Sequence, residues 1–149
     1  MKKIFIYYSF TGNGDEVANY LKDKNIAIRK VNTKEPLPQN RVLSIITGGF
    51  LAGIKHKDKL INFNNDISNY GQIIIGSPIW NGRLSCPINT VLDELNLTNK
   101  QVIFILYSGS GDAPKTNKLL KEKYPECKII QLKEPKQNQD IIKQVLKNI

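Results

Sequence analysis

The sequence predicts one α/β domain over residues 1–149, built as a doubly wound sheet of five parallel strands with helices on both faces. Five short apolar runs, typical of buried strands, alternate with segments whose apolar residues recur at helical spacing. Strands that alternate with helices pair in parallel through right-handed crossovers, so the helices form the outer two of three layers. A chain of 149 residues is also the usual size of one domain.

The expected strands comprise residues 4–8, 26–31, 72–76, 101–107 and 128–132, and the second is mixed enough to lie near an edge. The expected helices run from residue 14 or 15 to about 24, from about 87 to 95, from 114 to about 124, and from about 138 onward. Asp15 and Glu16 suit the positive end of a helix dipole, and Pro87 has the φ that a first turn needs. Residues 41–59 indicate a kinked or two-piece helix, because two adjacent glycines interrupt their apolar pattern.

Charge and composition narrow the classes of partner. The chain carries a formal net charge of +9, but its lysines are scattered instead of forming a stripe with interleaved aromatic residues. We therefore expect no nucleic-acid partner, whereas the positive charge favours acidic partners or anionic substrates. No apolar stretch reaches the ~18 residues of a membrane span, and the short apolar run after Lys3 lacks the cleavage site of a signal peptide. We expect a cytoplasmic protein without membrane contact.

The side chains that usually bind metals or act as nucleophiles are few. Cys86 and Cys127 lie too far apart for a zinc motif, and His56 is the only histidine. We expect two buried thiols, no metal site and no catalytic side chain.

The stretch from Ser9 to Gly14 links the first strand to the first helix. A strand, a loop of small and hydroxyl residues and a helix start form an anion cradle, because the N–H groups at the helix N-terminus are free and the helix dipole is positive there. Ser9 and Thr11 add hydroxyl donors, and Gly12 and Gly14 let a ligand approach the backbone. The loop holds no Lys or Arg, so the sequence predicts neutral donors for a phosphate.

Several phosphate-loop patterns can be compared with this stretch. The nucleoside-triphosphate pattern G-x-x-x-x-G-K-[ST] has no match in the chain, and the dinucleotide pattern G-x-G-x-x-G fails at Val17, where its third glycine should stand. The best match is the S/T-x-T-G-N loop with which flavodoxins bind the phosphate of FMN. A strand-to-helix turn that uses glycine and serine only for its geometry remains the alternative.

Two further loops, 77–82 and 108–112, follow the third and fourth expected strands and are also rich in small residues. Ligands of open parallel sheets bind outside the carboxyl ends of the strands, where all three loops should meet. This convergence is the main evidence for a ligand site, because each loop alone would be weak evidence.

The three loops resemble those of flavodoxin-like FMN proteins in order and spacing, and the resemblance covers most of the chain. It implies a three-layer fold with strand order 2-1-3-4-5 and FMN as the cofactor. It implies that the FMN phosphate is bound by Ser9, Phe10, Thr11, Gly12, Asn13 and Gly14. It also implies that Trp80 stacks on the isoalloxazine ring, in a pocket shaped by Ser77, Pro78, Ile79, Asn81 and Gly82. The pyrimidine side would be lined by Ser108, Gly109, Gly111 and Asp112.

The chain departs from the family pattern in ways that bear on function. Family loops often carry a hydroxyl residue where Gly14 stands, and Asp15 is unfavourable beside a phosphate unless it turns away. The loop 108–112 has no second stacking aromatic, and the chain is basic. A positive field favours the anionic reduced flavin, so we expect a less negative potential than that of the family's low-potential carriers.

The resemblance implies an electron carrier that docks to a redox partner protein, or an NAD(P)H-dependent reductase of quinones or other small acceptors. A flavin-free binding or signalling module of the same fold is the alternative from another class. Arg83, just after the second loop, could attract an anionic substrate or be a solvated surface residue. We expect a monomer or a homodimer.

Overall fold

The computed structural model describes residues 1–34 and 58–149 of the chain. In this part, five strands pair in parallel in the order β2-β1-β3-β5-β6. They are β1 (Lys3–Tyr7), β2 (Ala27–Lys30), β3 (Gln72–Trp80), β5 (Gln101–Ser108) and β6 (Lys128–Lys133). This order is the expected one, with the mixed strand β2 at an edge. The short strand β4 (Arg83–Leu84), which pairs antiparallel with the end of β3, was not predicted.

The described helices are α1 (Asn13–Lys22), α3 (Cys86–Glu94), α4 (Pro114–Lys123) and α5 (Gln139–Leu146). Each lies within two residues of its expected start, since the amphipathic pattern and the prolines mark these boundaries well. The two-piece helix expected at 41–59 falls almost wholly outside the described residues. None of the described helices has the length and apolar composition of a membrane span.

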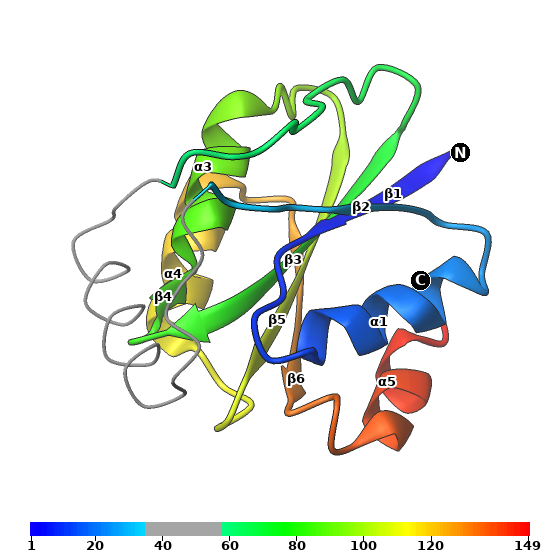
Figure 1. Cartoon of the computed structure of the whole chain (residues 1–149), viewed down its shortest axis with the longest axis vertical. Helices are drawn as coiled ribbons and strands as arrows, with labels where there is room; N and C mark the ends of the chain where they lie inside the picture. Colours follow the sequence, from blue (N-terminus) through cyan, green and yellow to red (C-terminus); the bar gives the residue numbers. More distant parts are fainter. Residues whose placement is uncertain (35–57) are drawn as a thin grey trace.

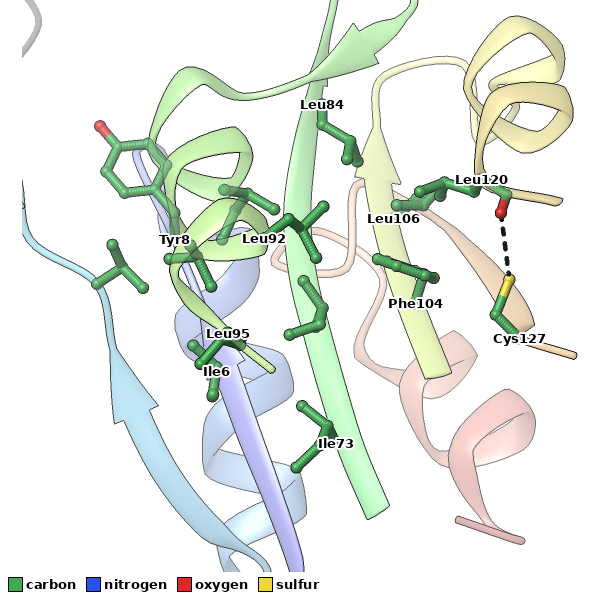
Figure 2. Close-up of a cluster of buried hydrophobic side chains, with 14 of the residues drawn as sticks. Ile6, Tyr8, Ile73, Leu84, Leu92, Leu95, Phe104, Leu106, Leu120 and Cys127 are labelled. Carbon is green, nitrogen blue, oxygen red and sulfur yellow. Dashed lines mark hydrogen bonds between the residues drawn. The ribbon is translucent and has the colours of Figure 1, made fainter. Parts of the chain in front are cut away.

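The helices form two layers around the sheet: α3 and α4 cover one face, and α1 and α5 cover the other (Figure 1). Alternate residues of the strands supply the two cores, because successive side chains of a strand point to opposite faces. Ile4 and Ile6 join the cluster under α3 and α4, whereas Phe5 and Tyr7 join the cluster under α1 and α5. Figure 2 shows the first cluster, with side chains of the strands packed against α3 and α4.

Strand β3 is longer than predicted, and this corrects the expected loop at 77–82. The sequence suggested that the strand ends at Gly76, but Ser77 to Trp80 continue it, and only Asn81 and Gly82 form the turn into β4. Both turn residues have positive φ, 49° and 67°, as a two-residue type I′ hairpin requires. An Asn-Gly pair is the usual sequence signal for such a turn.

Candidate cofactor site

The first loop lies between β1 and α1, and it leaves the start of the helix open. Gly12 stands at the N-cap with a φ of 94°, a left-handed conformation that favours glycine. No side chain among the described residues caps α1 by a hydrogen bond, so the N–H groups of its first turn can serve an anion. The geometry therefore has the features of an anion site.

The hydroxyl of Ser9 is a further donor that fits an anion at this site. Its Oγ is buried but makes no hydrogen bond of acceptable geometry within residues 1–34 and 58–149, although it lies near enough to Asp15 to help lower the pKa of that carboxyl. Buried hydroxyls normally have a partner, and a phosphate oxygen is a suitable acceptor. The donors of this loop thus fit the phosphate that the sequence predicts.

The carboxylate of Asp15, which would repel a phosphate, is engaged by two hydrogen-bond donors. Its Oδ1 accepts hydrogen bonds from the Tyr7 hydroxyl at 2.8 Å and from Lys30 Nζ at 2.7 Å. Burial opposes ionisation of Asp15, but these two bonds lower its pKa, while burial and the nearby carboxylate raise the pKa of Tyr7. The repulsion expected between Asp15 and a phosphate is therefore reduced by a paired cation from β2.

The absence of a side chain at position 14 has a steric cause. A Cβ on Gly14 would lie 2.5 Å from the Tyr107 hydroxyl and 2.9 Å from Tyr7 Cδ2, both in well-buried side chains. The Tyr107 hydroxyl is held in place because it donates to the carbonyl oxygen of Tyr8. A hydroxyl residue of the family pattern cannot be accommodated here without displacing a tyrosine.

The second loop contacts the first through aromatic rings. Trp80, at the end of β3, meets the rings of Tyr8 and Phe10 edge to face, with centroids 5.9 and 6.4 Å apart. The indole is partly exposed, which leaves part of it free to contact a ligand. Its predicted stacking on a flavin stays a prediction.

Ser77 has a structural contact that the sequence did not indicate. Its side chain is fully buried, and its Oγ accepts a hydrogen bond from the Ser85 backbone N–H at 3.1 Å and donates to the Pro78 carbonyl oxygen. This hydroxyl joins the end of β3 to the start of α3 and is already engaged. A contact from Ser77 to a cofactor would have to use its backbone.

The third loop, 108–112, is stabilised by bonds within itself. Ser108 Oγ accepts from the Gly111 N–H at 2.9 Å, and Asp112 Oδ1 accepts from the Ala113 N–H at 2.8 Å. Gly111 has a φ of 76°, and Gly109 is exposed. Because β5 lies beside β3, this loop and the second one leave the same edge of the sheet. The remaining predicted site residues, Thr11, Asn13, Ile79, Asn81 and Gly82, also lie in or beside the loops at this edge.

Residues 51–149 match the family model described as Flavodoxin. The chain belongs to the flavodoxin family. A candidate flavoprotein of Bacteroides uniformis is 20% identical, with a TM-score of 0.72 over 99% of this chain and 98% of its own. A flavoprotein of Lactobacillus acidophilus, solved in complex with FMN, is 20% identical, with a TM-score of 0.67 over 93% of this chain and 97% of its own. Both have the same fold as this chain, and among curated proteins there is no match.

Three lysines that the sequence did not indicate have side-chain atoms close to glycines of the three loops. A Cβ on Gly12 would lie 3.1 Å from Lys136 Cδ, one on Gly82 would lie 3.9 Å from Lys115 Cδ, and one on Gly111 would lie 2.8 Å from Lys133 Cβ. All three glycines have positive φ. Of the three lysine ammonium groups, the Nζ of Lys136 contacts a loop directly, since it donates to the Thr11 carbonyl oxygen at 3.3 Å. No local sequence signal indicated this contact.

The two cysteines are buried, as the sequence predicts. Burial raises the pKa of the Cys86 thiol to about 11 and also raises the pKa of Cys127, so neither thiol is activated. Within the described part of the chain, no three His, Cys, Asp or Glu side chains are grouped closely enough to bind a metal ion.

Proposed function

We propose that this protein binds FMN and transfers electrons through it, with the FMN phosphate in the loop from Ser9 to Gly14. The observation that carries the proposal is the buried Ser9 hydroxyl, which lacks a hydrogen-bond partner among the described residues beside the open N-terminus of α1. The family and the FMN complex of the Lactobacillus flavoprotein support FMN as the cofactor. A bound flavin supplies the one- or two-electron chemistry.

The chain itself positions the cofactor and excludes water from part of it. The open α1 turn and the Ser9 and Thr11 hydroxyls bind the phosphate, and Trp80 stacks on the ring system. The turn that follows Trp80 is held by Thr116 of α4, whose Oγ1 donates to the Gly82 carbonyl oxygen at 2.7 Å. This bond orients the indole by fixing the hairpin on which it stands.

Our first choice of activity is an electron carrier for a redox partner protein, active in the cytoplasm as a monomer or a homodimer. A second candidate is an NAD(P)H-linked reductase of quinones or similar acceptors. It is favoured by the loop 108–112, which has no aromatic side chain, so that it offers no ring to cover the second face of the flavin. Oxidation of NADH or NADPH by the flavin-loaded protein alone separates the two. The net charge of +9 and the Lys136 ammonium beside the first loop support a less negative potential in either case.

The test of the function is an absorbance spectrum of the purified protein before and after addition of FMN and desalting. We expect retained visible bands of oxidised flavin. Trp80→Ala should weaken FMN binding roughly two- to tenfold, the equivalent of the ~0.5–1.5 kcal/mol of an aromatic pair. Trp80→Phe, which keeps an aromatic ring, is the matched control and should lose less FMN affinity than Trp80→Ala. A folded protein that remains colourless and retains no FMN would refute the proposal and favour a flavin-free module.

A further inference from the structure

We propose that Lys136, from the turn between β6 and α5, is a cationic ligand of the flavin phosphate, an inference that rests on the proposed FMN binding. The sequence predicts only neutral donors, because the loop from Ser9 to Gly14 contains no basic residue. The fold supplies the charge from a segment more than a hundred residues away along the chain.

Two hydrogen bonds connect Lys136 to the phosphate loop, one from its backbone and one from the end of its side chain. Its backbone N–H donates to Asn13 Oδ1 at 3.0 Å, and its Nζ donates to the Thr11 carbonyl oxygen at 3.3 Å. Between these two bonds, its aliphatic stem lies against the bare Cα of Gly12, where a Cβ would approach its Cδ to 3.1 Å. The ammonium therefore lies beside the loop on which the anion binds.

A cation beside the loop would strengthen phosphate binding, because the nearby charges are either paired or negative. Lys30 of β2, which lies beside the first turn of α1, is engaged by Asp15 at 2.7 Å. The second acid of the first turn, Glu16, accepts a hydrogen bond from Gln139 of α5 at 3.1 Å. Gly14 supplies no hydroxyl, so Lys136 compensates for a donor that the family pattern often has. Hydrogen bonds to a charged donor are stronger than those between neutral groups, and Lys commonly binds phosphate as a point charge.

The contact with Thr11 does not prevent this role. An ammonium group has three N–H donors, and the Thr11 carbonyl oxygen accepts only one of them. Lys136 is exposed at this contact, so its Nζ can keep or release that bond and donate to a phosphate oxygen. Its partner at the loop is neutral, which means that no competing carboxylate must be displaced.

The experiment measures the dissociation constants of FMN and of riboflavin, which lacks the phosphate, by quenching of flavin fluorescence. We expect Lys136→Gln to weaken FMN about tenfold, the lower end of the range for a hydrogen bond to a charged group, and to leave riboflavin unchanged. Lys136→Arg should restore most of the FMN affinity. Lys143→Gln removes the same charge from an exposed position of α5 and should bind both flavins like the wild type. In about 1 M salt, where the Debye length is ~3 Å, the difference between wild type and Lys136→Gln should shrink.

Each other outcome overturns the inference. Unchanged FMN affinity in Lys136→Gln excludes a phosphate contact, and equal losses for FMN and riboflavin mean that the lysine only supports the loop. Lys136→Met keeps the stem against Gly12 and should repeat the loss for FMN; an affinity like that of the wild type would assign the effect to loop packing. Wild-type protein that binds neither flavin would instead refute the proposed function itself.

Discussion

Replacement of Gly14 by alanine tests whether the tyrosines around the first loop exclude a side chain there. The added Cβ would lie 2.5 Å from the Tyr107 hydroxyl, 2.9 Å from Tyr7 Cδ2 and 3.0 Å from Ser9 Cβ. Overpacking of this kind costs about 1–3 kcal/mol, and the upper end applies because the tyrosines are well buried. Alanine regains about 1 kcal/mol of helix propensity. We expect Gly14→Ala to lower the free energy of unfolding by about 2 kcal/mol.

The assay is urea unfolding of the flavin-free protein followed by circular dichroism, with thermal unfolding as a second measurement. For a chain of this size the loss corresponds to a melting temperature about 4–8 °C lower. Gly109→Ala is the matched control, because a Cβ there meets nothing within 4 Å, and it should leave stability unchanged or raise it by up to about 1 kcal/mol. In the background of Tyr107→Phe, which removes the nearest atom, Gly14→Ala should cost about 1 kcal/mol less.

The reasoning is refuted if Gly14→Ala is as stable as the wild type, since the tyrosine side chains would then move aside without a loss of stability. It is also refuted if Gly109→Ala loses as much as Gly14→Ala, because the effect would then belong to glycine replacement in general. An unchanged cost of Gly14→Ala when the Tyr107 hydroxyl is absent would assign the clash to other atoms.

Two further predictions concern the polar contacts around the loops. Asp15→Asn should destabilise the protein by about 0.5–1 kcal/mol at pH 7, because it loses a partly exposed ion pair with Lys30. The pKa of Asp15 is lowered in the folded protein, so this contribution is complete above its unfolded pKa, near 3.8, and is lost as the pH falls through the folded value. The difference in unfolding free energy between wild type and Asp15→Asn should therefore be smaller at about pH 2.5 than at pH 7. An equal difference at both pH values in urea unfolding would contradict this prediction. Ser77→Ala should cost about 2 kcal/mol, because it leaves the Ser85 N–H without an acceptor in the interior, whereas Ser110→Ala at an exposed position should change stability by less than about 0.5 kcal/mol. A loss of less than about 0.5 kcal/mol in Ser77→Ala, measured by urea unfolding, would show that the Ser85 N–H finds another acceptor.

The sequence by itself determined most of the strands and helices of the described part of the chain, because the signals for these elements are local. The apolar run from Ile4 to Tyr8 and the helical spacing of Ile88, Val91 and Leu92 mark a buried strand and a core-facing helix without any knowledge of neighbours. The Asn-Gly pair at 81–82 also marks a hairpin turn, and that signal could have located the end of β3. The positions of the three loops at strand ends follow from the same alternation.

Only the tertiary structure decided which groups share the site and which side chains are already engaged. Lys136 contacts a loop from which it is separated by 123 residues, and Asp15 is paired with Lys30 of the neighbouring strand. Ser77 carries the same hydroxyl as Ser9, yet one is bonded in the interior while the other lacks a hydrogen-bond partner in the described residues. These facts depend on strand order, register and crossover, which bring distant residues within a few ångströms. Patterns of neighbouring residues encode which element forms, but not which side chains meet once the elements have packed.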